Sequence, residues 1–263
     1  MKKEEKALLF NLLKTADAAI HGYTRDVFAD ERTFSDDEAA PQKTDFHAET
    51  GGKIADDESQ SGMVSQSAQS NRDGITLDDV KAKIMRCTRC PLARTRNSVV
   101  PGQGVENPLV LVVGEGPGAD EDATGLPFVG KAGVLLDKML AAIQLDRAKN
   151  CYIANVVKCR PPQNRNPEPE EQAACFGFLE AQIHILKPRM ILCMGKIAAE
   201  KLLDRPLPIT REHGNFFEYN GIPLMPTYHP SALLRNEELK RPAWEDLKGF
   251  RRRLDQILGQ SQA

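Results

Sequence analysis

From residue 76 onward, short apolar runs alternate with segments that carry apolar residues at helical spacing. A short continuous apolar run predicts a strand that is buried on both faces of a sheet. Such runs lie at 109–113, 152–157 and 190–194, and a hairpin across Asn220-Gly221 leads into a fourth core strand that ends at 227. Helices are predicted at 76–85, 132–143, 169–186, 196–203 and 244–258. This alternation predicts an α/β fold in which helices cover a mainly parallel sheet.

The first part of the chain has a different pattern. Leucines near helical spacing predict an amphipathic helix at 4–20, whereas 35–73 is rich in Asp, Glu, Ser, Gln and Gly and has little apolar surface to bury. We therefore expect an N-terminal helical extension, a disordered acidic Ser/Gln linker and one folded domain: 1–34, 35–75 and 76–263. The pattern does not identify a protein partner for the N-terminal helix.

Composition and charge favour a cytoplasmic protein that can meet nucleic acid. The chain has 263 residues, of which 41% are hydrophobic, so it can build a packed core. No apolar run approaches the roughly 20 residues that span a bilayer, and no secretory signal is present, so we expect no membrane partner. The net charge is −2, but residues 1–75 contribute −6 and the remainder +4, so the folded domain can present a basic face.

Four of the six cysteines form a candidate metal centre. Cys87 and Cys90 have C-x2-C spacing in a polar loop, where a small apolar filler has no purpose. Together with Cys159 and Cys175 they supply four thiolates, which suits a [4Fe–4S] cluster or a structural zinc ion, and the ligand set alone does not choose between them. The other two cysteines lie in predicted strands and are interpreted as inert core thiols: Cys151 and Cys193.

Two glycine-rich segments raise the question of a nucleotide site. Gly114-Glu-Gly-Pro-Gly118 follows the first core strand, but Pro117 and the acidic residues after it do not fit a dinucleotide-binding turn. The segment from Gly125 to Lys131 matches the start of a P-loop, but Ala132 replaces the Ser or Thr that binds Mg²⁺. A P-loop NTPase that depends on Lys131 is therefore an alternative, although we expect no nucleotide cofactor.

Three polar or glycine-rich features come directly after predicted strands. They are Gly114–Gly118, Asn155 and Tyr228-His229-Pro230. Ligands of parallel sheets bind at the carboxyl ends of the strands, which meet at one edge. We therefore expect these three segments to form a single site.

Taken together, the motifs resemble those of the family 4, or iron–sulfur, uracil-DNA glycosylases. The resemblance covers 76–263 and rests, in chain order, on Cys87-x2-Cys90, Gly114-Glu-Gly-Pro-Gly-Ala-Asp-Glu121, Gly125-Leu-Pro-Phe-Val-Gly-Lys-Ala-Gly133, Asn155-Val-Val-Lys-Cys159-Arg-Pro-Pro, Cys175 and Tyr228-His-Pro-Ser231. It implies a three-layer α/β/α sandwich and a DNA repair hydrolase that flips uracil out of single- or double-stranded DNA, cleaves its N-glycosidic bond and leaves an abasic site. It also implies a structural [4Fe–4S] cluster whose ligands are Cys87, Cys90, Cys159 and Cys175.

The resemblance assigns roles that agree with the chemistry of this reaction. The target base must leave the stack, after which Phe128 faces it and the Asn155 amide reads its edge by donating and accepting hydrogen bonds. His229 stabilises the developing uracil anion, and Glu115 activates water or stabilises the sugar cation, so the catalytic set is Glu115, Asn155 and His229. Glu121 crowds the C5 position and excludes the methyl group of thymine. Backbone groups line the pocket at Gly114, Glu115, Gly116 and Gly118.

DNA contacts are implied for two further groups. The segment 230–235 enters the minor groove, with Leu233 or Leu234 as an apolar wedge and Arg235 as a phosphate or base contact. Basic side chains elsewhere are expected to contact phosphates: Arg94, Arg96, Lys158, Arg160 and Arg165.

Two further alternatives make different predictions. A uracil-DNA crosslinking branch of the same superfamily carries a histidine-containing basic loop after the Asn strand, and this chain has no histidine between Asn155 and Arg165. A non-catalytic, metal-stapled DNA-binding module, such as a polymerase accessory, would bind DNA without releasing uracil.

Overall fold

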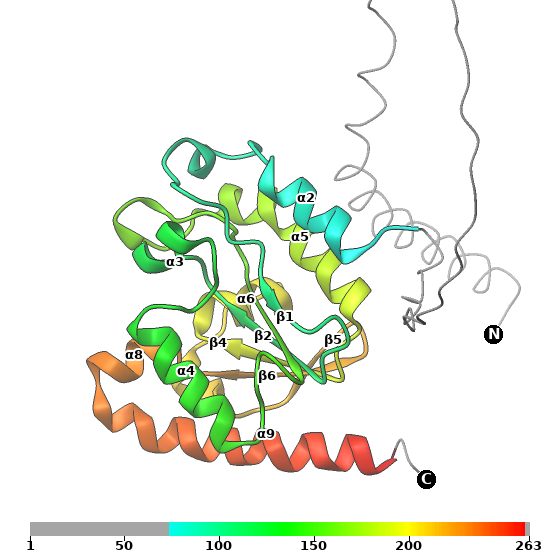
Figure 1. Cartoon of the computed structure of the whole chain (residues 1–263). Coiled ribbons are helices and arrows are strands. Elements are labelled where there is room, and N and C mark those ends of the chain that lie inside the picture. Colours follow the sequence, from blue (N-terminus) through cyan, green and yellow to red (C-terminus); the bar gives the residue numbers. More distant parts are fainter. Residues whose placement is uncertain (1–73, 261–263) are drawn as a thin grey trace, which may run out of the picture. The chain divides into compact units, whose positions relative to one another are not determined.

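A six-stranded sheet in the order β1-β3-β2-β4-β6-β5 forms the centre of residues 74–260, the part of the chain that the computed structural model describes (Figure 1). The central strands β3, β2, β4 and β6 pair in parallel, and the edge strands β1 and β5 are antiparallel to their neighbours. The strands span Gln103–Gly104 (β1), Val110–Gly114 (β2), Cys151–Asn155 (β3), Met190–Met194 (β4), Phe217–Tyr219 (β5) and Ile222–Thr227 (β6).

Helices lie on both faces of the sheet. Figure 1 shows α2 and α5 on one side and α4 and α9 on the other, which confirms the predicted α/β/α sandwich with a mainly parallel sheet. The α-helices span Leu77–Met85 (α2), Ala119–Thr124 (α3), Lys131–Ala142 (α4), Pro169–Leu186 (α5), Lys196–Leu203 (α6), Ile209–Glu212 (α7), Pro230–Arg235 (α8) and Lys240–Gln260 (α9). Short 3₁₀ turns span Pro91–Arg94 (η1), Pro162–Asn164 (η2) and Glu237–Leu239 (η3).

Helices cover both faces of the sheet because neither face of its central strands is polar. Every residue of β2, β3 and β4 is buried. Alternate residues of β2, Val110 and Val112, join the core that α4 and α9 complete, and the residues between them face the opposite layer. The continuous apolar runs thus become doubly covered parallel strands, as parallel sheets require.

Several boundaries differ from the predicted ones, and two predictions lie outside the described residues. The second core strand, predicted to reach 157, ends at Asn155, and the last helix begins at Lys240 rather than 244. The short elements β1, α3, α7 and α8 were not predicted, because a few residues show no period of either kind. The predicted N-terminal helix and residues 35–73 of the predicted linker are not described, so the domain division stays a prediction.

The segment that matches the start of a P-loop has another geometry. Gly125 ends α3 in a left-handed conformation, and Gly130 caps α4. The segment is therefore a link between two helices, whereas a P-loop joins a strand to a helix. This arrangement excludes the P-loop interpretation. Within 74–260, no helix has the length and apolar character needed to cross a membrane.

The close contact between Gly133 and the backbone of Phe128 can be tested by its effect on stability. A Cβ atom at this position would overlap the carbonyl oxygen of Phe128, whereas a Cβ at Gly249 in α9 would meet only the end of Arg252, at 3.9 Å. We expect Gly133→Ala to lower the free energy of unfolding by about 2 kcal/mol or more through overpacking. Gly249→Ala should raise it by up to about 1 kcal/mol, because alanine favours helix. Urea denaturation of both variants measures the free energy of unfolding. If the two substitutions changed it in the same direction, the close packing at Gly133 would be contradicted.

Candidate active site and cysteine cavity

Parallel pairing brings two of the predicted site segments together. Gly114, the last residue of β2, is paired with Asn155, the last residue of β3. A Cβ atom on Gly114 would overlap Oδ1 of Asn155 and lie 2.6 Å from Cζ of Phe128. Only glycine at 114 therefore allows the Asn155 amide and the tip of the Phe128 ring to approach the end of β2 as they do.

Phe128 lies between the ends of β2 and β6. Its ring centroid is 5.5 Å from that of His229, and the two planes are tilted by 31°. Its backbone has a φ of 53°, in the left-handed region. For a bulky side chain this conformation costs about 1–3 kcal/mol, and it persists only where the surroundings hold it.

A hydrogen bond from the backbone of Ser231, in the first turn of α8, determines the neutral tautomer of His229. Nδ1 lies 3.1 Å from the backbone nitrogen and 2.8 Å from Oγ of Ser231, so the Ser231 N–H donates to it. Because Nδ1 accepts, the proton of a neutral ring lies on Nε2. Burial lowers the pKa of His229 to about 4, and Arg235 nearby adds to this effect. The ring is therefore a neutral hydrogen-bond donor at pH 7.

Asn155 has an acceptor atom without a partner. The residue is 2% exposed, and within the described part of the chain its Oδ1 accepts no hydrogen bond. Leaving a buried polar atom unpaired costs about 1–3 kcal/mol, so such an atom in a native protein needs an explanation. A ligand that donates a hydrogen bond to Oδ1 is one explanation.

Glu115 follows Gly114 at the same edge of the sheet. It is partly buried, and burial raises the pKa of its carboxyl above the ordinary value. Its carbonyl accepts from the Val157 N–H at 3.1 Å, which ties the glycine-rich segment to the chain that leaves β3. Gly116 lies against the same residue, since a Cβ there would be 2.7 Å from Cγ2 of Val157.

Glu121 forms hydrogen bonds inside the protein. Its Oε2 accepts from the Gly118 N–H at 3.0 Å, and its Oε1 accepts from the N–H groups of Val129 and Gly130 at 2.9 and 3.0 Å. These bonds join the glycine-rich segment to the turn that carries Phe128. A role in crowding the C5 position of uracil stays a prediction.

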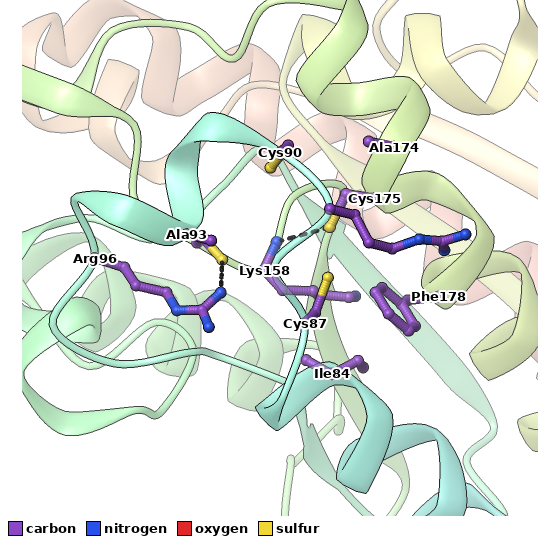
Figure 2. A pocket seen from close by; sticks show the side chains of 11 residues that line it. Ile84, Cys87, Cys90, Ala93, Arg96, Lys158, Ala174, Cys175 and Phe178 are labelled. Atoms are coloured by element: carbon purple, nitrogen blue, oxygen red, sulfur yellow. Dashed lines mark hydrogen bonds between the residues drawn. The ribbon is translucent and has the colours of Figure 1, made fainter. Parts of the chain in front are cut away.

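The four predicted metal ligands line one cavity between α2, η1 and α5. Figure 2 shows the sulfur atoms of Cys87, Cys90 and Cys175 turned toward the same space, and Cys159 lines it too. No three His, Cys, Asp or Glu side chains among the described residues are placed to hold one metal ion. Four thiols that line one cavity are a donor set that fits an iron–sulfur cluster.

The surroundings of the cavity supply donors to sulfur. Arg96 Nη1 donates to Cys159 Sγ at 3.0 Å, and the backbone N–H of Lys158 donates to Cys175 Sγ at 3.3 Å. Burial raises the pKa of Cys175 to about 12, so a bound cation would be needed to hold it as a thiolate. Cys151 and Cys193 are fully buried in β3 and β4, as expected for core thiols.

Four of the five basic side chains expected to contact phosphates form hydrogen bonds within the protein, among them Arg160, whose Nε donates to Asn164 Oδ1 at 2.8 Å. Lys158 is 1% exposed, and its Nζ donates to the carbonyl of Asn155 at 2.8 Å and to Gln182 Oε1 at 2.7 Å. The phosphate assignment of Lys158 is therefore wrong, and a lysine in a polar motif gave no signal of burial. Arg165 forms a two-pronged ion pair with Glu171, and Arg96 faces the cysteine cavity (Figure 2).

The segment 230–235 forms α8, and its two leucines differ. Leu233 is 2% exposed and packs in the core, so it is not available as a wedge. Leu234 is 47% exposed, and Arg235 next to it is exposed as well. Of the two predicted wedge residues, only Leu234 is therefore exposed.

The comparisons with known proteins agree with this fold. The sequence model of the Uracil DNA glycosylase superfamily matches residues 101–248. Type-4 uracil-DNA glycosylases are similar to this chain: that of Thermotoga maritima is 46% identical over 65% of the chain and 91% of the relative. Those of Archaeoglobus fulgidus and Pyrobaculum aerophilum are 41% and 42% identical over 66% and 67% of the chain and 90% and 93% of each relative. The chain belongs to the uracil DNA glycosylase superfamily and, within it, to the type-4 family.

The geometry around His229 predicts its titration. The ring should stay neutral, with its proton on Nε2, down to about pH 5, and it should titrate near pH 4 rather than 6.5. The unfolded chain binds a proton at His229 near pH 6.5, whereas the folded protein binds it only near pH 4. The free energy of unfolding should therefore decrease as the pH falls from about 6.5 to about 4. Nitrogen-15 NMR of the imidazole tests this, with the His229→Gln spectrum as the assignment control. A doubly protonated ring at about pH 6 would contradict it.

Proposed function

We propose that this protein removes uracil from DNA by hydrolysing the N-glycosidic bond, which releases the base and leaves an abasic site for base excision repair. The observation that carries this proposal is the convergence of Gly114, Phe128, Asn155 and His229 at one edge of the sheet. Their side chains offer an aromatic face, a free amide acceptor and a neutral N–H donor. These are the groups that a site for a flipped pyrimidine needs.

The base is recognised by Phe128 and Asn155. The Phe128 ring, held beside His229, provides a face on which uracil stacks once it has left the helix. The unpaired Oδ1 of Asn155 accepts from the N3–H of uracil, and the amide NH₂ donates to the adjacent carbonyl. Thus binding of the base satisfies a buried acceptor that otherwise has no partner.

Bond cleavage depends on His229 and Glu115. As the C–N bond breaks, negative charge develops on the uracil ring, and the Nε2–H of neutral His229 donates to the carbonyl oxygen that carries it. The sugar develops oxocarbenium character, which the Glu115 carboxylate stabilises while it orients the attacking water. Burial raises the pKa of Glu115 above that of an ordinary glutamate. As the pH is lowered, the activity should therefore begin to fall at a higher pH than it would with an ordinary glutamate in this role.

Leu234 and Arg235 are the proposed contacts to the DNA around the flipped nucleotide. Leu234 is an exposed leucine on a short helix that begins at His229, so an apolar wedge and the leaving-group donor come from one segment. We expect the exposed Arg235 to contact a phosphate or a base edge. Base eversion and anion stabilisation are thereby linked through α8.

The cysteine cavity is the proposed site of a [4Fe–4S] cluster held by Cys87, Cys90, Cys159 and Cys175. The donor set, the shared cavity and the N–H donors to sulfur support this proposal. Hydrolysis of an N-glycosidic bond transfers no electron, so the cluster would act as a structural staple between α2, the chain after β3, and α5.

Glu115→Gln tests the catalytic proposal. We expect it to slow uracil release from single-stranded DNA by about 100-fold or more, because the carboxylate charge is lost. Glu180→Gln is a matched control, since burial also raises the pKa of Glu180, which lies on α5 and contacts Tyr219. It should keep normal activity.

Three results would contradict parts of this proposal. Normal release by Glu115→Gln would remove Glu115 from the catalytic set. Wild-type protein that binds DNA but releases no uracil would favour a non-catalytic module. An adduct with uracil-DNA that survives SDS would favour the crosslinking branch.

Cys175→Ala tests the cluster. We expect the anaerobically purified wild type to contain about four iron atoms and to show visible absorbance that dithionite bleaches. Cys175→Ala should lose most of the iron and absorbance, whereas Cys193→Ala, which removes a buried thiol of β4 outside the cavity, should retain both. Stoichiometric zinc, or unchanged iron in Cys175→Ala, would contradict the assignment.

A further inference from the structure

Arg147 lies between α4 and β3 and reaches the turn that carries Phe128. Its Nη1 donates to the carbonyl of Pro127 at 2.8 Å, and its Nη2 donates to the carbonyl of Phe128 at 3.0 Å. One guanidinium thus binds two consecutive carbonyls through two separate nitrogen atoms, which the planar fork of arginine provides and the single nitrogen of a lysine ammonium does not. No motif in the sequence marks this arginine.

The guanidinium is itself fixed. Asp137 on α4 accepts from Nε at 3.0 Å and from Nη2 at 2.7 Å, and Gln103 Oε1 lies 3.4 Å from Nη1. The Arg147 side chain is 17% exposed, so solvent competes little for its N–H groups. A side chain held in this way defines the position of the carbonyls that it binds.

A side chain of the opposite charge, Glu121, binds the same turn. The Glu121 carboxylate accepts from the N–H groups of Val129 and Gly130, the two that follow Phe128. A cation therefore binds two carbonyls of the turn, and an anion binds the two amides that follow them. These contacts surround a phenylalanine with a φ of 53°, a conformation that needs such support.

We propose that Arg147 is a positioning residue for the reaction: by binding the carbonyls of Pro127 and Phe128 it fixes the Phe128 ring between Gly114 and His229, where the everted uracil stacks. The inference rests on the proposed function and deepens it. Arg147 touches neither the base nor the reacting atoms, and acts only through Phe128. Once the Phe128 ring is absent, the loss of Arg147 should therefore cause no further decrease in kcat/KM for uracil release.

A double-mutant cycle on kcat/KM for uracil release tests this. Arg147→Met keeps an unbranched apolar stem and removes all donors of the side chain. We expect kcat/KM to decrease about tenfold, because small misplacements of a binding group reduce rates. Phe128→Ala should lose about 30-fold or more through the missing stack. The double variant should be no more than about twofold worse than Phe128→Ala alone.

Arg251→Met is the matched control. Arg251 also donates to a carbonyl, that of Ile143, and pairs with an acidic side chain, Asp255. It should leave kcat/KM within about twofold of the wild type. Affinity for uracil-free DNA should be unchanged in Arg147→Met, because Phe128 meets only an everted base.

If Arg147→Met does not give folded protein, Asp137→Ala replaces it, because this carboxylate is 53% exposed and anchors the guanidinium. The same cycle with Phe128→Ala should then show a decrease of about threefold that disappears in the double variant. Multiplicative losses in the double variant, or normal activity of the single variant, would overturn the positioning role while leaving the glycosylase proposal intact. An inactive wild type would overturn the proposed function, and this inference with it.

Discussion

Backbone hydrogen bonds between β2 and β3 impose the constraint on which the site depends. Their parallel register ends both strands together, with Gly114 beside Asn155. Because Gly114 has no side chain, the Asn155 amide and the Phe128 ring occupy the space above the strand end. β6, on the far side of β4, ends at the same edge and leads into His229. A shift of register in this sheet would separate all of these groups.

The chain that leaves β3 connects this edge with the cysteine cavity. Within four residues it supplies Asn155 at the edge and Cys159 in the cavity, and buried Lys158 lies between them. Its Nζ binds the carbonyl of Asn155, while its backbone N–H donates to Cys175. Different contacts thus hold the two ends of this connection. A metal centre bound in the cavity would therefore also restrain Asn155, the residue proposed to read the base.

The predicted and observed structures differ where a local pattern carries no information about distant partners. Apolar runs predicted β2, β3 and β4 because strands covered on both faces must be apolar throughout. Charge and motif position alone gave Lys158 a phosphate contact, although the fold encloses it with Gln182. Motif position also left Leu233 and Leu234 equivalent, although one packs in the core and the other is exposed. Arg147 had no sequence signal at all.

The sequence by itself determined which chemistry the chain carries: the cysteines, the strand-end glycines, Asn155 and His229, and the order of strands and helices. These follow from residue types and short-range periodicity, which are properties of the chain alone. Only the tertiary structure decided which side chains are buried, which donors meet which acceptors, and how the strained Phe128 turn is held. Such contacts join residues far apart in the chain, and their energies depend on solvent exclusion by the assembled layers.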